Sequence, residues 1–473
     1  MSQHHRRYRS ADWDEPLVME LGHPGRRGFS PGEIEPDVCE RVGDPQNLVS
    51  PALRRPTAPA LPELSEFETQ RHYLHLSQEV LGMMGINLFG TCTMKYNPRV
   101  NEALAGRPEL AEVHPLQPVD TVQGVLAIIH GLDLILRELS GMDQFVFQAG
   151  GGADASYTHA CVTRAYHASR GQLEQRTQVI TSIQTHPCNP ATAAAAGFQV
   201  ITLPLEEGGY PSVDALRSAV SDRTAALMIG NPDDMGVYNP HIKEWVRIVH
   251  EAGGLCFYDH ANFNGVMGKI RARELGFDAC MFMLHKTFGA PKGGGGPAVG
   301  AYGCTSELVP YLPRPLVVAR DDSDSGTTRY ELENDAPMSI GKVREFWGNV
   351  PQIVKAYCWA RAMGAQGIDE ASDISVLANN YMEQRLLNIR GVTKSHPHLS
   401  GPRMEMTRYS IEELAEETGV TVEDVEHRMV DFGVDAFWLS HEPWLVPEPF
   451  TPEAGEAWSK EDIDTWVDVM APL

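Results

Sequence analysis

The sequence predicts an α/β protein with a mostly parallel sheet in a large domain with helices on both faces, a smaller α+β C-terminal domain and an extended N-terminal arm. Between residues 145 and 284, short apolar segments alternate with segments of helical period, which is the pattern of βα units. The chain has 473 residues, 42% hydrophobic and 22% charged. This length suits two or three packed lobes, and the composition is typical of globular proteins.

The arm is predicted over residues 1–65, which are rich in Pro, Gly and Arg, as in SPALRRPTAPALPEL at 50–64. Such a composition rarely builds a core of its own. We therefore expect it to lie over the rest of the chain or over a neighbouring subunit. A helix should begin at residue 66, because Ser65 occupies the N-cap and Glu68 the capping-box position.

The large domain is predicted over residues 66–340. Its segment at 124–139 reads as a buried amphipathic helix and is too short to span a bilayer. Helices are expected in DASYTHACVTRAYHASRG, VDALRSAVS and KEWVRIVHEAGG, and strands at 145–149, 177–183, 198–205, 225–231, 255–259 and 279–284. In sheets of this kind, ligands bind beyond the carboxyl ends of the strands.

The C-terminal domain is predicted over residues 341–473, with helices at 343–364 and 376–389 followed by a mixed, acidic region. The whole chain has 39 basic and 63 acidic residues, a net charge of -24. Residues 401–473 hold 18 Asp/Glu against 4 Lys/Arg, which is a net of -14. This balance argues against binding to nucleic acid or to an anionic membrane, since both need a basic surface.

The cysteines and the N-terminus indicate a cytoplasmic protein. The eight cysteines contain no C-x-x-C pair, so neither a disulfide framework nor a zinc ribbon is expected. No apolar stretch follows the basic residues at the N-terminus, so the chain does not begin like a secretory signal. We expect no metal site.

Two strand ends carry side chains suited to one chemistry. An apolar strand delivers Asp259 in YDHAN (258–262), and another delivers Lys286 in LHKT (284–287). Pyridoxal phosphate requires such a pair, because a lysine forms a Schiff base with its aldehyde and a carboxylate keeps its pyridine nitrogen protonated. His285 and Asn262, beside these two residues, are further candidates for cofactor binding.

A third part of such a site is an anion cradle for the phosphate. Gly151, Gly152 and Ala153 follow a strand and precede a helix, so they offer backbone N–H groups at a helix N-terminus. His186 is a candidate for stacking on the cofactor ring. Taken singly, each feature has an ordinary explanation: a helix cap or ion pair, a solvated lysine, a tight turn or a structural histidine. Their order on one βα domain favours the functional interpretation.

Several long motifs resemble one known family nearly from end to end. They are PLVMELGHPGRRG (16–28), NLFGTCTMKYNPRVNE (87–102), CNPATAAAAGFQV (188–200), FYDHANFNGVMG (257–268), MLHKTF (283–288), GGGGP (293–297) and SIGKVREFWGN (339–349). The chain resembles subunit 2 of glycine dehydrogenase (decarboxylating), the P-protein of the glycine cleavage system in its two-subunit form.

The resemblance implies a fold-type I pyridoxal-phosphate enzyme. It assigns Lys286 to the Schiff base, Asp259 to the pyridine nitrogen and His186 to ring stacking. It also implies that glycine is decarboxylated and that the aminomethyl group passes to the lipoyl group of a carrier (H-) protein. A sibling subunit 1 would complete a heterotetramer, or the chain would form a dimer.

The sequence departs from the family pattern near the expected cofactor. The departures are AGGGADAS (149–156), Pro187 after His186, Lys292 before the Gly run, and WLVPEPFTPE (444–453) with extra residues around Glu456 and Trp458. Two alternatives therefore stay open. One is a P-protein-like enzyme that acts on a different amino acid as a decarboxylase, lyase or aminotransferase. The more remote one is a non-catalytic scaffold subunit, against which the presence of both Lys286 and Asp259 argues.

Overall fold

The computed structural model describes residues 14–26, 33–79, 86–87, 97–291, 298–322, 327–344, 346–436 and 445–471. Lys292 and the GGGGP run at 293–297 lie outside these ranges. The chain divides into two compact units: residues 1–86 with 429–435, and residues 87–428 with 436–473. The predicted domain boundaries at residues 65 and 340 stay predictions.

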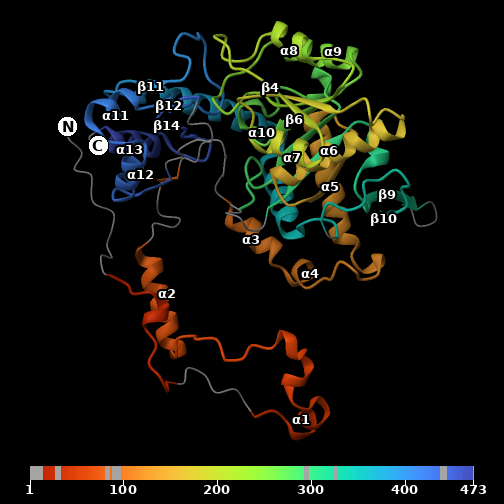
Figure 1. Cartoon of the computed structure of the whole chain (residues 1–473), viewed down its shortest axis with the longest axis vertical. Coiled ribbons are helices and arrows are strands. Elements are labelled where there is room, and N and C mark those ends of the chain that lie inside the picture. Colours follow the sequence, from red (N-terminus) through yellow and green to blue (C-terminus); the bar gives the residue numbers. More distant parts are fainter. Residues whose placement is uncertain are drawn as a thin grey trace. The chain divides into compact units, whose positions relative to one another are not determined.

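The first unit contains two described α-helices, α1 (Pro36–Val42) and α2 (Glu66–Glu79) (Figure 1). The predicted capping box opens α2: the Ser65 N–H donates to Glu68 Oε2 over 2.9 Å, and the Glu68 N–H donates to Ser65 Oγ over 3.2 Å. The described residues before α2 are mostly exposed, as expected for a Pro- and Gly-rich segment without a core of its own.

A seven-stranded sheet lies at the centre of the second unit, in the order β2-β8-β7-β6-β5-β3-β4. Its strands are β2 (Gln144–Ala149), β3 (Gln178–Ser182), β4 (Gln199–Leu203), β5 (Thr224–Gly230), β6 (Leu255–His260), β7 (Ala279–Met283) and β8 (Gly300–Cys304). β4, β3, β5, β6 and β7 are parallel neighbours. All six predicted strands are therefore present, within two residues of their predicted ends.

Side chains alternate between the two faces of the sheet, as strand geometry requires. In β6, Cys256 and Tyr258 belong to one hydrophobic cluster, whereas Leu255 and Phe257 belong to another. The first cluster includes residues of α5 (Gln123–Ser140), α8 (Val213–Ala219), α9 (Ile242–Glu251) and the start of α10 (Val350–Leu386). The second includes residues of α6 (Gly152–Ser169) and α7 (Cys188–Ala195). Helices thus cover both faces, as predicted (Figure 1).

Two features of this unit were not predicted from the sequence. β8 pairs antiparallel with both β2 and β7, and β9 (Leu316–Asp322) and β10 (Thr327–Glu333) form a separate antiparallel pair. Both segments lack the uniform apolar run that marks a buried parallel strand. GAYGC is rich in glycine, and the β9–β10 pair carries charged residues.

The predicted helix at 343–364 was wrong at its start. Helix α10 begins at Val350, with a proline in its first turn, and Gly348 has a φ of 102°, a conformation that does not continue a helix. The predicted helices at 343–364 and 376–389 are joined in this one element, which is interrupted by non-helical backbone at Gly364.

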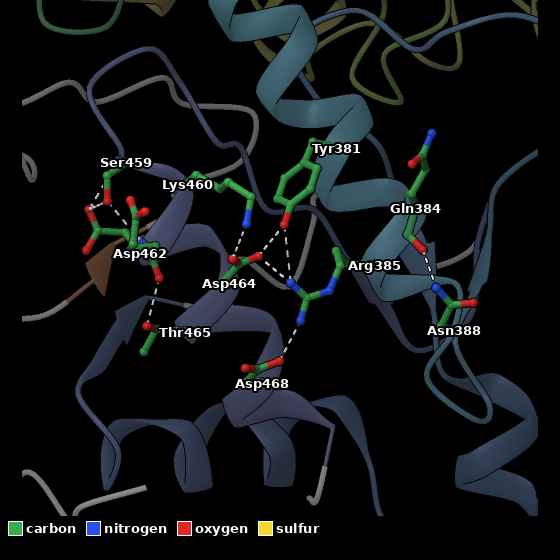
Figure 2. Close-up of polar contacts among 11 residues, drawn as sticks. Tyr381, Gln384, Arg385, Asn388, Ser459, Lys460, Asp462, Asp464, Thr465 and Asp468 are labelled. Atoms are coloured by element: carbon green, nitrogen blue, oxygen red, sulfur yellow. Dashed lines mark hydrogen bonds and ion pairs between the residues drawn. The ribbon is translucent and has the colours of Figure 1, made fainter. Parts of the chain in front are cut away.

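The C-terminal part packs α13 (Lys460–Met470) against the end of α10 through a group of charged side chains (Figure 2). Asp464 accepts from Tyr381 Oη and from Lys460 Nζ, each over 2.5 Å, and pairs with Arg385. Arg385 also donates to Asp468 over 2.6 Å. Part of the acidic charge of this region therefore joins two helices rather than only facing solvent.

Short elements complete the fold. They are α3 (Arg99–Ala105), α4 (Pro108–Ala111), α11 (Glu412–Thr418), α12 (Val422–Val430), β1 (Ile86–Asn87), β11 (Thr393–Lys394), β12 (Tyr409–Ser410), β13 (Val434–Ala436) and β14 (Pro449–Phe450). β11, β12 and β14 form a small sheet. In the described part of the chain, no helix has the length and apolar character needed to cross a membrane.

Candidate active site

A pocket opens at the carboxyl ends of the parallel strands. Four of the predicted site residues line it together: His186, Asp259, Asn262 and Lys286. They come from segments that directly follow β3, β6 and β7 or end those strands, and adjacent parallel strands bring such residues to one edge. The sequence prediction of where a ligand would bind therefore agrees with the position of this pocket.

Asp259 is held by hydrogen bonds to both carboxylate oxygens. The Ala261 N–H donates to Oδ1 over 2.9 Å, and Asn189 Nδ2 donates to Oδ2 over 2.8 Å. Burial raises the pKa of Asp259, while the nearby His186 and the two hydrogen bonds oppose that rise. Lys286 has the same opposing effect. A cation placed against this carboxylate would favour its charged form.

Lys286 follows β7 and is buried, with 6% of its surface exposed. Its neighbour His285 does not appear among the described residues that line the pocket. The pKa of His285 is lowered to about 4 by burial and by the Lys286 charge. His285 is therefore a neutral imidazole next to the lysine, and its predicted contact with a cofactor stays a prediction.

His186 lies in the loop between β3 and α7. The Cys188 N–H donates to His186 Nδ1 over 3.1 Å, which fixes the ring against the start of the helix. On another wall, Asn262 Nδ2 donates to Glu453 Oε2 over 3.1 Å. Asn262 thus connects the end of β6 to a buried carboxyl group of the C-terminal region.

Gly151, Gly152 and Ala153 lie after β2 at the N-terminus of α6, as the sequence predicts: Gly151 is the N-cap residue, and Gly152 and Ala153 are the first two residues of the helix. No described atom lies within 4 Å of a Cβ built on Gly151, and the nearest to one on Gly152 is Met283 Sδ at 3.6 Å. This leaves open space beside the first turn of α6. The three residues are absent from the described lining of the pocket with Lys286, so their role toward a phosphate stays a prediction.

Two groups of residues at this site were not predicted from the sequence. Asn189 is fully buried in α7 and contacts Asp259. No local sequence pattern distinguishes it from the other residues of this helix. Asp233 and Asp234 follow β5 and line the pocket, and their signal was the pair of carboxyls at another strand end.

Asp233 and Asp234 form an acidic wall of the pocket. Burial raises the pKa of Asp233 to about 7, against the opposing effect of hydrogen bonds from the Val237 and Met235 N–H groups. Gln184 Nε2 donates to Asp233 Oδ2 over 2.7 Å. Asp234 Oδ2 is buried and has no hydrogen-bond partner among the described residues.

These residues fit a pyridoxal-phosphate site, because a buried amine, a doubly hydrogen-bonded carboxylate and an imidazole line one pocket. The fold defines the same class. Residues 143–309 match the aminotransferase class-V family. The structure resembles that of glycine decarboxylase (P-protein) of the glycine cleavage system in inhibitor-bound form, with a TM-score of 0.75, 21% identity, and coverage of 94% of this chain and 99% of that one. A cysteine desulfurase from Escherichia coli gives a TM-score of 0.60 at 17% identity, with coverage of 81% and 93%. The predicted fold-type I class of pyridoxal-phosphate enzymes is thereby confirmed.

Sequence relatives narrow this class to one family. The probable glycine dehydrogenase (decarboxylating) subunit 2 of Pyrococcus abyssi is 43% identical over 468 residues, which cover 98% of this chain and 90% of the relative. Its namesake from Thermococcus onnurineus is 44% identical over 465 residues, with coverage of 98% and 89%. The one from Halalkalibacterium halodurans is 39% identical over 468 residues, with coverage of 97% and 91%. The chain belongs to the family of glycine dehydrogenase (decarboxylating) subunit 2, as its motifs predicted.

Proposed function

We propose that this chain is a catalytic subunit that decarboxylates glycine and passes the aminomethyl group to the lipoyl group of a carrier (H-) protein. The observation that carries this proposal is the single pocket in which Lys286, Asp259 and His186 meet. Family membership supports the choice of glycine, since the relatives named above are probable glycine dehydrogenases (decarboxylating).

Bound pyridoxal phosphate would supply an electron sink for the charge that the departing carbon dioxide leaves on the substrate. The chain's own residues prepare for this in separate ways. Lys286 Nζ would bond to the aldehyde and later hold a proton. Asp259 would keep the ring nitrogen protonated, and His186 would stack on the ring. The burial of Lys286 and Asp259 keeps water away and strengthens their mutual interaction.

The proposed reaction requires protein partners. We propose a lipoyl carrier protein as acceptor and a sibling subunit 1, in a heterotetramer or a dimer, acting in the cytoplasm. If the carrier binds to the C-terminal region with its net charge of -14, it should present a basic patch, and its association rate should fall with added salt.

The test is exchange of labelled bicarbonate into the carboxyl group of glycine. The wild-type chain with sibling subunit and carrier should show exchange, and the Lys286→Ala variant in the same mixture should show none. Purified wild-type chain should also be yellow and lose its colour on borohydride reduction. A wild-type chain that takes up no cofactor would contradict the proposal and leave the scaffold alternative.

A second candidate is a related enzyme that acts on a different amino acid, and the acidic wall favours it. Asp233 and Asp234 add two carboxyl groups to the pocket, and a cation placed beside them would favour their charged forms. A substrate with a positively charged side chain would interact favourably with such a wall. Spectral change with that amino acid, together with no glycine exchange in the full mixture, would support this candidate.

A further inference from the structure

Asn189 connects Asp259, the predicted partner of the cofactor's ring nitrogen, to helix α6. Its Nδ2 donates to Asp259 Oδ2 over 2.8 Å, and its Oδ1 accepts from Ser156 Oγ over 2.9 Å. Ser156 lies in α6 and Asn189 in α7, and both side chains are fully buried. One chain of hydrogen bonds therefore joins α6, α7 and the end of β6.

The alternation of side chains along β6 explains why Asp259 and Asn189 meet. Leu255 and Phe257 belong to the hydrophobic cluster that includes residues of α6 and α7. Because side chains of a strand alternate, Asp259 points to the same face. A carboxylate on the other face would lie among the residues packed with α5 and α9, without access to Asn189.

The amide of Asn189 is hydrogen-bonded through both its nitrogen and its oxygen. Its Nδ2 also donates to Thr185 Oγ1 over 3.1 Å, and Thr185 Oγ1 accepts from the Gly230 N–H over 3.3 Å. With two donor contacts on one side and the Ser156 hydroxyl on the other, the amide has one favourable orientation. A flipped amide would place its oxygen against Asp259 and lose both donations.

We propose that Asn189 is a positioning residue for the proposed reaction: its amide fixes the Asp259 carboxylate that would meet the ring nitrogen of the cofactor, and Ser156 holds that amide in place. This inference rests on the proposed function. The hydrogen bond from Asn189 favours the charged form of Asp259, and only a charged carboxylate can stabilise a protonated ring nitrogen. Asn189 thus acts on the reaction through Asp259.

The experiment compares three variants of the full chain loaded with pyridoxal phosphate. Asn189→Asp keeps the side-chain shape and replaces the donor by an acceptor. Ser156→Ala removes the hydroxyl that orients the amide and leaves Asp259 intact. Asn388→Asp is the matched control for the added charge, because Asn388 is exposed just after α10 and its side chain donates to Gln384 O.

The readouts are cofactor affinity, the pH dependence of the visible absorbance of the bound cofactor, and the melting temperature of the cofactor-free chain. We expect Asn189→Asp to weaken cofactor affinity by about tenfold or more, equivalent to ~1.4 kcal/mol, and to shift the pH profile. Ser156→Ala should shift both in the same direction by less, and Asn388→Asp should shift neither.

Wild-type affinity and pH profile in both Asn189→Asp and Ser156→Ala would overturn the inference. So would a lower melting temperature of the cofactor-free variants without any change in the pH profile, because that result indicates a purely structural role. A wild-type chain that binds no cofactor would instead contradict the proposed function, so the two failures are distinguishable.

Discussion

Asp464 joins α13 to α10, and its removal should weaken the C-terminal region by a measurable amount. The carboxylate accepts from Tyr381 and Lys460 and pairs with Arg385 (Figure 2). The side chains of Asp464 and Arg385 are 25% and 32% exposed, and that of Lys460 is 63% exposed. Asp464→Ala therefore removes three polar contacts in a partly solvated setting.

The magnitude follows from this exposure. The Lys460 pair, with its exposed ammonium, should contribute only ~0.3–0.5 kcal/mol, and the Arg385 and Tyr381 contacts ~0.5–1 kcal/mol each. The expected loss for Asp464→Ala is thus about 2 kcal/mol in total. At roughly 2 cal/mol/K of unfolding entropy per residue, a chain of this length would melt about 2 °C lower if it unfolds in one step.

The assay is a double-mutant cycle with Asp464→Ala and Arg385→Ala, measured by denaturant unfolding followed by circular dichroism. We expect a coupling of about 0.5–1 kcal/mol between the two sites. The pKa of Asp464 is lowered from its ordinary value of 3.8, so its stabilisation is present above that pH and is lost as the pH falls below it. Additivity of the two substitutions within about 0.3 kcal/mol near neutral pH would refute the reasoning.

Three further predictions concern the pocket and the core. Gly236→Ala should destabilise the chain by well over 1 kcal/mol and weaken cofactor binding, since a Cβ there would lie 1.9 Å from Met406 O at a φ of +74°. The control is Gly419→Ala, at a φ of +76° with open space around it. Equal losses in melting temperature for the two variants would contradict the predicted clash. Trp245→Ala should cost about 3–5 kcal/mol, because this indole is fully buried; a loss below about 1 kcal/mol in denaturant unfolding would show that the site collapses without cost. Asp233→Asn should flatten the pH dependence of the melting temperature. The pKa of Asp233 is raised from 3.8 to about 7 in the folded chain, so the folded state binds the proton more tightly than the unfolded state does. The wild type loses this stabilisation as the pH rises through that range. Parallel pH profiles for wild type and Asp233→Asn would contradict the raised pKa.

The part of the site that the sequence predicted consists of residues at strand ends. Asp259 and Lys286 each follow an apolar run, so the chain order alone places them at the ligand edge of a parallel sheet. Asn189 lies in a helix and faces Asp259 only because of how α7 packs on the sheet. No local pattern contains that information.

The parts of the fold that were missed depend on pairing between distant segments. β8 lies between β2 and β7, and its glycine-rich sequence has little strand propensity of its own. Gly303 lies against the Phe145 ring, where a Cβ would come within 2.2 Å of the ring carbon Cζ. A larger residue with better strand propensity would not fit, so tertiary packing outweighs local preference at this position.

The exposed apolar side chains of the first unit bear on how the protein can be handled. Leu17, Leu48, Leu53, Leu61 and Phe67 are each 67–78% exposed, and exposed apolar side chains promote association where they form a contiguous patch. When it is expressed alone and concentrated, the chain should self-associate or adsorb to surfaces. Mild detergent, or co-expression with a protein that binds these side chains, should raise its yield. These exposed side chains should therefore affect purification of the protein before any assay of the pocket.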